Sequence, residues 1–487
     1  MNAIGLDLGT SSVKAVLLSQ GGELLGEASA PLEVSRPHPL WSEQDPDDWL
    51  TAAELAMRQL RERAGDAWQQ VATLGVAGQM HGATLLDAAG EVLRPCILWN
   101  DGRSQAQCVA LEAREPDTRR ITANPAMAGF TAPKLMWVQQ HEPEIHARVA
   151  KVLLPKDWLV WQLAGVMSGD CSDASGTLWL DVARRRWSDT MLQATGMRAA
   201  QMPELHEGCD AVGTLQPRWA SAWGLPIGIT VVAGAGDNAA GAVGVGVTRP
   251  GTGFVSLGTS GVVFVATDGP QPNPDRGVHA FCHALPGVWH QMAVMLSASS
   301  ALSWWCGVAG SPPEALLRTL QPGEVRAAAP LFLPYLSGER TPHADPGAQA
   351  GFIGMTHSTT RDDLSYAVLE GVAFSFADGA AALRETGELP QRLLAIGGGA
   401  RSDAWLQLMA DTLGVTLDRP SGAEVGPALG AARLALKARG VHLVDDTPPI
   451  ARSFTPDPGR AQALAERLQR FRTAYRPVRQ LIPKETP

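Results

Sequence analysis

The stretch Leu6-Asp7-Leu8-Gly9-Thr10-Ser11-Ser12-Val13 decides the fold, because a close copy returns as Val255-Ser256-Leu257-Gly258-Thr259-Ser260-Gly261-Val262. Both copies are typical of a strand, a tight turn and a second strand. Each turn combines a glycine with small hydroxyl residues, so its backbone N–H groups can face a phosphate. One difference affects the chemistry, since the first copy has Asp7 where the second has Ser256. The repeat predicts two similar lobes with facing phosphate turns, and therefore an ATP-handling enzyme that works in the cleft between them.

Length and charge narrow the class of protein. A chain of 487 residues exceeds what one hydrophobic core normally supports, so two domains are expected. Pro and Gly punctuate the segment 247–253 just before the repeated strand, which predicts domains at 1–246 and 247–487. The net charge is −9 and no basic run occurs. Nucleic acid and anionic membranes are therefore not expected partners.

Cysteine usage and the N-terminus indicate a cytoplasmic protein. None of the six cysteines is paired at metal-ligand spacing, and a large chain needs no disulfide framework, so reduced thiols are expected. No basic region precedes an apolar run at the N-terminus, and Asp7 interrupts the one candidate. The uncharged stretch 292–310 contains four serines and is flanked by prolines. It is interpreted as a buried helix rather than a membrane span.

Alternating strands and helices predict an α/β fold. Three short strands are expected at 2–8, 13–19 and 23–27, followed by a helix with Asp45 as N-cap and Pro46 at its first position. Further predicted elements are strands at 71–77, 230–233 and 393–396, a long helix capped by Thr360, a helix that begins at Ser402 or Asp403, and a helix at 458–474. Residues 105–220 mix helices and loops and are interpreted as an elaboration of the first lobe.

Asp7 is a candidate metal-binding carboxylate. It ends an apolar strand, where a carboxylate is costly unless it is paired, hydrogen-bonded or bound to a cation. Mg²⁺ keeps much of its hydration shell and uses few carboxylates, so the expected contact to Asp7 passes through water. A turn-capping role is the alternative. Lys14 lies where the second hairpin strand can return its charge toward the loop, and a solvated strand lysine is nearly as consistent with the pattern.

Asp237 is the candidate catalytic base. It follows a strand and the segment Gly234-Ala235-Gly236, and it opens a helix of alanine and glycine. The helix N-terminus favours its ionised form, and the small neighbours let other groups approach closely. A simple N-cap is the structural alternative, because aspartate is preferred at that position.

The glycine-containing loops exclude a P-loop fold, weaken the case for a dinucleotide enzyme, and include a triple glycine that is either a nucleotide-binding loop or a flexible turn. Gly397-Gly398-Gly399-Ala400 lies between a predicted strand and a predicted helix, where a backbone can approach a nucleotide closely. No lysine in the chain follows a glycine, so a P-loop is excluded. The dinucleotide fingerprint fails at 234–239, where Ala239 replaces the third glycine.

Five motifs together resemble the FGGY family of carbohydrate kinases, in order and spacing over nearly the whole chain. They are Asp7-Leu8-Gly9-Thr10, Gly129-Phe130-Thr131-Ala132-Pro133-Lys134-Leu135-Met136-Trp137, Gly236-Asp237-Asn238, Gly258-Thr259-Ser260 and Gly397-Gly398-Gly399-Ala400. Members that phosphorylate D-xylulose are the most similar at Gly78-Gln79-Met80-His81-Gly82, Trp99-Asn100-Asp101-Gly102-Arg103 and Ser337-Gly338-Glu339-Arg340-Thr341-Pro342. Members that phosphorylate glycerol have an Arg–Glu pair in place of Met80-His81, which disfavours glycerol as substrate.

The resemblance implies a two-domain actin-like, ribonuclease H-like fold, with ATP and sugar in a cleft between the lobes. It implies that Asp237 is the base, that Asp7 lies at Mg²⁺ and the phosphates, and that Met80 and His81 contact the sugar. Further expected sugar-pocket residues are Trp99, Asn100 and Asp101. Expected nucleotide-side residues are Thr10, Ser11, Lys14, Gly258, Thr259, Gly398, Gly399 and Asp403.

The implied reaction is transfer of the γ-phosphoryl group of ATP to O5 of D-xylulose. A kinase for another ketose or polyol, such as ribulose or gluconate, is the near alternative. A non-enzymatic ATP- or sugar-dependent switch on the same fold is the alternative from another class. Lys134 and Trp137 are expected to be structural, and Glu339-Arg340 to be either functional or a domain-interface salt bridge. Relatives are often dimers, so a homodimer is included among the expectations.

Overall fold

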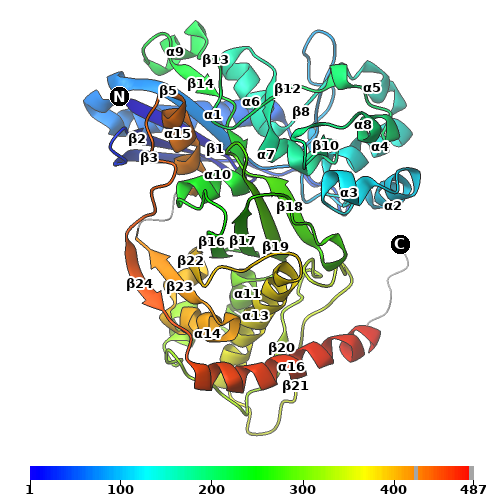
Figure 1. Ribbon diagram of the computed structural model, residues 1–487, viewed down its shortest axis with the longest axis vertical. Helices are drawn as coiled ribbons and strands as arrows, with labels where there is room; N and C mark the ends of the chain where they lie inside the picture. The colour runs from blue at the N-terminus through cyan, green and yellow to red at the C-terminus, as the bar shows by residue number, and fades with distance from the viewer. Residues whose placement is uncertain (422–425, 482–487) are drawn as a thin grey trace.

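Two lobes, each built on a mixed sheet, form the molecule in the computed structural model, which describes residues 1–421 and 426–481 (Figure 1). The first sheet has the order β13-β14-β5-β1-β2-β3, with β15 also paired to β5. Its strands are β1 (Asn2–Leu8), β2 (Ser12–Ser19), β3 (Leu24–Pro31), β5 (Val71–Gly78), β13 (Ala211–Thr214), β14 (Thr230–Val232) and β15 (Ala235–Gly236).

The second sheet has the order β18-β19-β17-β16-β22-β23-β24. Its strands are β16 (Gly253–Leu257), β17 (Gly261–Thr267), β18 (Val278–Cys282), β19 (Trp289–Met295), β22 (Arg392–Ile396), β23 (Thr416–Pro420) and β24 (Ile450–Phe454).

The two sheets repeat one topology. In the first, β1 pairs antiparallel with β2 and parallel with β5, and β5 pairs parallel with β14. In the second, β16 pairs antiparallel with β17 and parallel with β22, and β22 pairs parallel with β23. The two copies of the repeated segment thus form equivalent hairpins, β1–β2 and β16–β17. The prediction of an α/β fold with two related lobes is confirmed.

Helices cover both sheets at the positions that the capping signals predicted. Asp45 accepts a hydrogen bond from the backbone N–H of Asp47 at the start of α1 (Pro46–Ala64), which places Trp49, Ala53 and Leu60 in the first core. Thr360 forms a capping box with Asp363 at the start of α13 (Arg361–Arg384). Ser402 is the N-cap of α14 (Asp403–Leu413).

The remaining helices and strands lie outside the two large sheets. In the first lobe they are β4 (Glu43–Gln44), β6 (Thr84–Leu86), β7 (Cys96–Ile97), α2 (Gln105–Arg114), α3 (Thr118–Thr122), α4 (Thr131–His141), α5 (Pro143–Arg148), β8 (Lys151–Leu153), α6 (Pro155–Ala164), β9 (Ser168–Asp170), α7 (Cys171–Ala174), β10 (Leu180–Asp181), β11 (Arg186–Trp187), α8 (Asp189–Ala194), β12 (Glu204–His206), α9 (Pro217–Trp223) and α10 (Asp237–Gly244). In the second half they are α11 (Ser299–Ala309), α12 (Pro313–Leu317), β20 (Leu331–Leu333), β21 (Gly351–Ile353), α15 (Gly426–Ala438) and α16 (Pro458–Leu481). Short 3₁₀ helices lie at 65–70, 175–177 and 199–201 in the first half and at 274–276 and 398–401 in the second.

One helix of the second half covers the first sheet. Helix α15 packs on β1, β5 and α10, and its alanines form a buried cluster with Ala3, Val16 and Val232 (Figure 1). Glycines permit the approach, since a Cβ on Gly5 would lie 1.9 Å from the backbone oxygen of Ala428. A domain boundary between residues 246 and 247 stays a prediction. Helix α15 follows that boundary in the sequence, although the sheet that it covers precedes the boundary.

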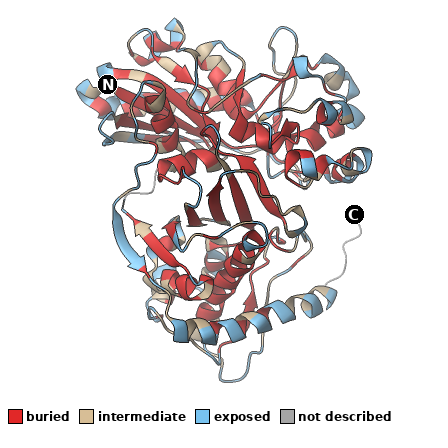
Figure 2. Ribbon diagram, in the orientation of Figure 1, coloured by how far each residue is buried: buried red, intermediate tan, exposed pale blue. Residues whose placement is uncertain are grey.

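The uncharged stretch 292–310 differs from its interpretation as one buried helix. Strand β19 continues to Met295, and α11 begins at Ser299 with only part of its surface buried. Helix α13 is the one described helix whose length and composition suit a membrane span, and 94% of that apolar window is buried inside the molecule (Figure 2).

Candidate active site

Asp7 and Asp237 are brought together by strand pairing in the first sheet. Strands β1 and β15 both run parallel to β5, so Asp7 is in register with Ala77 and Gly236 with Gly78. Ligands of open α/β sheets bind at the carboxyl ends of parallel strands. Asp7, near the end of β1, and Asp237, directly after β15, therefore occupy the edge where a site is expected.

Asp237 is a carboxylate with one occupied and one available oxygen. The backbone N–H and the side-chain amide of Asn238 both donate to Asp237 Oδ1, at 2.7 and 2.9 Å. Among the residues that the structure describes, no donor is bonded to Oδ2. Burial raises the pKa of Asp237 to about 6, and the two Asn238 donors oppose that rise. The carboxylate is thus ionised at neutral pH and retains affinity for a proton.

Asp7 is a buried carboxylate with an unsatisfied oxygen. Burial and the neighbouring Asp237 carboxylate raise the pKa of Asp7 to about 7, while Lys14 lowers it. Within the described part of the chain, Asp7 Oδ1 has no hydrogen-bond partner. Lys14 stands directly opposite Asp7 in the β1–β2 pair, so both side chains project from the same face of the sheet. A hydrated divalent cation beside Asp7 would relieve both the burial cost and the repulsion.

The turn of the β1–β2 hairpin is held by a hydrogen-bond network that reaches the loop after β5. Thr10 Oγ1 donates to Gln79 Oε1 at 2.9 Å and accepts from Trp99 Nε1 at 2.9 Å. Gln79 donates in turn to Gln44, which also donates to the Thr10 carbonyl. Ser11 is exposed at the tip of the turn. The turn and the loop after β5 are therefore fixed relative to each other.

His81 is a neutral imidazole with a defined tautomer. Its Nδ1 lies 2.8 Å from the carbonyl oxygen of Gly176, which can only accept, so Nδ1 holds the proton and Nε2 is an acceptor. Burial lowers the pKa of His81 to about 3. Its neighbour Met80 is buried against Gly236, immediately before Asp237. The pair thus offers an apolar contact and a hydrogen-bond acceptor close to the candidate base.

Helix α4 fixes the loop of His81. Lys134 is fully buried, and its Nζ donates to the His81 carbonyl at 2.8 Å, as does Thr131 Oγ1 at 3.1 Å. His81 has a φ of 71°, a left-handed conformation that is uncommon outside glycine. Lys134 therefore has a structural role, as the sequence predicts, because it holds the left-handed backbone of His81 in place.

The three sugar-pocket candidates at 99–101 differ in exposure and in bonding partners, and the sugar contacts of Trp99 and Asn100 stay predictions. Asn100 is exposed, and Trp99 is 41% exposed while bonded to Thr10. The Asp101 carboxylate accepts from both Nε and Nη2 of Arg103 and from the Ser42 backbone. Arg103 also stacks over Trp41 at 3.6 Å. Asp101 is thus occupied by a buried ion pair, and its sugar contact stays a prediction.

The turn of the β16–β17 hairpin, where the second phosphate contact is predicted, adjoins the triple-glycine loop. The carbonyls of Gly258 and Thr259 accept backbone N–H groups from Ser299, Ala298 and Ser300 at the start of α11. A Cβ on Gly397 would lie 2.8 Å from the Leu257 carbonyl, and Gly397 has a φ of 89°. Gly398 has open space on its Cβ side. Gly258, Thr259, Gly398 and Gly399 are therefore neighbours on one edge of the second sheet.

Asp403 has cationic partners at the start of α14. Its carboxylate forms ion pairs with Arg419, at 2.8 Å, and with Arg452. Arg419 also donates to the carbonyls of Ala400 and Arg401 in the glycine loop. Asp403 thus shapes the loop through arginine, and a direct nucleotide contact stays a prediction.

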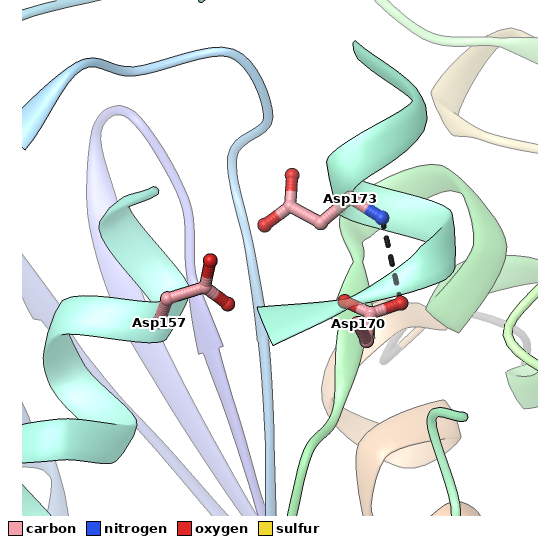
Figure 3. Close-up of side chains that lie close together, drawn as sticks. All are labelled: Asp157, Asp170 and Asp173. Carbon is pink, nitrogen blue, oxygen red and sulfur yellow. Dashed lines mark hydrogen bonds between the residues drawn. The ribbon is translucent and has the colours of Figure 1, made fainter. Parts of the chain in front are cut away.

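Figure 3 shows a buried acidic cluster, one member of which, Asp173, interacts electrostatically with Asp237. Asp157 on α6, Asp170 at the end of β9 and Asp173 on α7 have ligand oxygens within 4.8 Å of one another. Lys156 Nζ lies 2.5 Å from Asp157 and 3.0 Å from Asp170, and it also donates to the Ala233 carbonyl. The lysine supplies the positive charge of the cluster, so we assign it as a buried ion-pair network and not as a metal site.

The network supports the strand that leads to Asp237. Ser172 Oγ donates to Asp170 and accepts the backbone N–H of Gly236 at 3.1 Å. Asn238 and Ser172 were not identified from the sequence. The signal for Asn238 was its place beside Asp237, whereas Ser172 is distant in sequence and only the fold brings it to Gly236.

Aromatic side chains of the two lobes meet beside His81. The His81 ring lies 4.5 Å from Phe130 and 6.3 Å from Phe281 of β18, and Phe130 lies 5.6 Å from His279. The sugar-side loop of the first lobe is thus in contact with the edge strand of the second. Within the described residues, Glu339 and Arg340 form no side-chain ion pair, so the salt-bridge alternative was wrong.

Comparisons with known proteins agree with this geometry. The FGGY family of carbohydrate kinases matches with its N-terminal domain at residues 2–244 and its C-terminal domain at residues 253–439. Xylulose kinase of Escherichia coli (strain K12) is 51% identical over 485 residues, which cover 99% of each chain. Xylulose kinase of Bacillus subtilis (strain 168) is 36% identical, covering 97% of this chain and 95% of that protein.

A solved structure of xylulose kinase from Brucella ovis superposes with a TM-score of 0.95 at 47% identity, covering 99% of this chain and 100% of that one. The repeated sheets, the paired carboxylates and these matches over the whole length lead to one conclusion. The chain belongs to the FGGY family of carbohydrate kinases.

Proposed function

We propose that this phosphotransferase moves the γ-phosphoryl group of ATP to O5 of D-xylulose, giving D-xylulose 5-phosphate and ADP. The single observation that supports the chemistry best is the Asp237 carboxylate. One oxygen is held by Asn238 and the other is available, at a sheet edge shared with Asp7. The relatives named xylulose kinase support the choice of sugar.

Asp237 Oδ2 accepts the proton of the attacking hydroxyl as that oxygen approaches the γ-phosphorus. A base with a pKa of about 6 is ionised at neutral pH, yet basic enough to take a proton in the transition state. Little covalent work falls to the protein in phosphoryl transfer, so positioning supplies most of the acceleration.

The phosphates lie between the turn at Thr10 and Ser11 and the turn at Gly258 and Thr259. Backbone N–H groups of both turns stabilise the charge that develops on the transferred group. The buried, unsatisfied Asp7 Oδ1 fits a hydrated Mg²⁺, a cation that prefers oxygen ligands and keeps much of its water. Mg²⁺ bound with ATP would neutralise part of the phosphate charge. Lys14 adds a further positive charge near Asp7.

The sugar lies against Met80 and His81. His81 Nε2 accepts a hydrogen bond from a sugar hydroxyl, because Nδ1 donates to the Gly176 carbonyl. We also propose that the enzyme acts in the cytoplasm. All six of its cysteines are free, as a reducing compartment requires.

A panel of acceptors tests the proposal. Purified enzyme is assayed for ADP release with D-xylulose, D-ribulose, gluconate, glycerol and no sugar. D-Xylulose is expected to give the highest kcat/KM, at least about tenfold above the others, because a site with placed polar groups rejects analogues that leave those groups unpaired. Faster turnover with ribulose or gluconate would replace the sugar assignment. Equal rates with and without any sugar would contradict kinase activity itself.

A further inference from the structure

Arg340 is a cation of the second lobe that lies at the boundary with the first. Its backbone is tied at both ends, since its N–H donates to Glu339 Oε1 at 2.8 Å and its carbonyl accepts from Ala344. The next residue, Thr341, bonds to Val294 and Gly277. The backbone of Arg340 is therefore fixed within the second lobe.

The guanidinium of Arg340 has one polar contact among the described residues, a long one to His279. Its Nη1 lies 3.4 Å from His279 Nε2. Asn124 donates from Nδ2 to the carbonyls of Thr122 and Ala280, so its Oδ1 is the acceptor for His279 Nδ1. His279 is thus protonated at Nδ1, and its Nε2 accepts from Arg340. The other guanidinium donors remain unused.

Arg340 lies beside the cluster of aromatic rings that contains His81. The rings of His81, Phe130, Phe281 and His279 form one contact cluster, and Arg340 adjoins it through His279. The charge of Arg340 is close enough to contribute to the lowered pKa of His81. The Nε2 acceptor of His81 from the first lobe and the guanidinium donors of Arg340 from the second lobe therefore belong to residues that contact the same cluster of aromatic rings.

We propose that Arg340 is a substrate-binding residue of the second lobe. Its guanidinium donates a hydrogen bond to an oxygen of the bound ketose, while His81 of the first lobe accepts a hydrogen bond from a hydroxyl of the same sugar. The proposal rests on the proposed sugar-kinase function. A sugar hydroxyl both accepts and donates, so it matches a guanidinium on one side and a bare imidazole nitrogen on the other. The contact would also couple closure of the lobes to the presence of sugar.

The free-energy cost of partly burying the Arg340 guanidinium supports the proposal that it binds a ligand. A half-buried guanidinium that forms no ion pair loses hydration that such a pair would replace, and the charge of Glu339 offsets only part of the lowering of the Arg340 pKa that burial causes. Glu339 is adjacent in sequence, but its Oε1 accepts from the backbone N–H groups of Leu296 and Arg340 itself. A planar fork of donors is suited to neighbouring oxygens of a polyol.

The test compares Arg340→Met and Arg340→Lys with the parent enzyme and with Arg318→Met, an exposed arginine of the same lobe. Arg340→Met is expected to raise KM for D-xylulose about tenfold or more and to change KM for ATP less than about twofold, since a hydrogen bond to a charged group is lost only on the sugar side. Arg340→Lys is expected to recover part of the loss. Arg318→Met is expected to behave as the parent.

Labelling of the parent enzyme keeps the test independent of how the variants fold. Phenylglyoxal modification of Arg340, read by mass spectrometry, is expected to slow at least about threefold with saturating D-xylulose and to be unchanged by ATP alone. Protection by ATP alone, or an unchanged sugar KM in Arg340→Met, would overturn the assignment. Those outcomes are distinguishable from failure of the proposed function, in which the parent enzyme itself shows no sugar-dependent ADP release.

Discussion

At the scale of single residues, the charge state of Asp237 couples catalysis to stability. Its carboxylate is buried, and its pKa of about 6 lies above the 3.8 of an unfolded chain. The folded state therefore binds the proton more tightly, and the contribution of Asp237 to stability falls as pH rises from about 4 through 6. At neutral pH the site holds a charge that opposes folding, which is the cost of a usable base.

Asp237→Asn is predicted to lower kcat by about a hundredfold or more while sugar and ATP still bind, because the amide cannot accept the hydroxyl proton. It is also predicted to raise Tm at pH 8, since the buried charge is removed. Steady-state kinetics, calorimetric binding and thermal unfolding measure the three effects. Parental turnover in the variant would refute the assignment of the base.

The pH dependence of kcat/KM is predicted to show an acid limb between about pH 6 and 7, because Asp237 must be ionised to accept a proton and Asp7 must be ionised to hold a cation. A histidine would ordinarily be suspected, yet burial lowers the pKa of His81 to about 3. His81→Asn, which tolerates the left-handed backbone, is expected to raise KM for the sugar and to leave the limb in place. Loss of the limb in that variant would assign it to His81 instead.

At the scale of elements, the helix α7 and strand β15 are joined by Ser172. Ser172→Ala is predicted to leave the buried Gly236 N–H without an acceptor, at a cost of about 1–3 kcal/mol. Because Asp237 follows Gly236 directly, kcat is expected to fall about tenfold, with little change in KM for ATP.

The matched control for Ser172 is Ser168→Ala on the adjoining strand β9. Ser168 is buried, and its hydroxyl has no partner among the described residues, so its removal breaks no hydrogen bond. Kinetics and denaturant unfolding of both variants separate loss of position from loss of fold. Equal behaviour of the two variants would show that the bond to Gly236 does not position Asp237.

The contact of α15 with β1 depends on a glycine. A Cβ on Gly5 would lie 1.9 Å from the Ala428 carbonyl and 2.8 Å from the Ala432 nitrogen, and backbone cannot yield as a flexible side chain does. Gly5→Ala is therefore predicted to destabilise the fold by more than about 2 kcal/mol. Gly269→Ala, with open space around its Cβ position, is the control and is expected to unfold at the parental midpoint.

At the scale of the whole molecule, the two halves of the chain are interleaved. Helix α15 belongs to the second half in sequence, yet it covers Ala3, Val16 and Val232 of the first sheet. The first lobe accordingly lacks part of its core until residues 426–438 have been added.

A fragment of residues 1–246 is predicted to expose that apolar face, to bind a hydrophobic dye and to unfold without a cooperative transition. Attaching residues 426–438 through a flexible linker is expected to restore cooperativity. A cooperative, dye-free fragment 1–246 would show that the first lobe folds without α15.

The sequence by itself determined the local elements and the chemistry at their ends. The repeated hairpins, the caps at Asp45 and Thr360, and the places of Asp7 near the end of β1 and of Asp237 after β15 all depend on short-range patterns. Such patterns arise from backbone sterics and capping, which act within a few residues.

Only the tertiary structure decided which distant groups meet. The pairing of Asp101 with Arg103, Ser172 with Gly236, α15 with the first sheet and Arg340 with His279 near His81 had no reliable signal in the chain. Most of these partners are separated by tens to hundreds of residues, and packing of whole elements brings them together. Arg103 is close to Asp101 in sequence, but the burial that makes their ion pair structural comes from Trp41 and Glu43 of another segment.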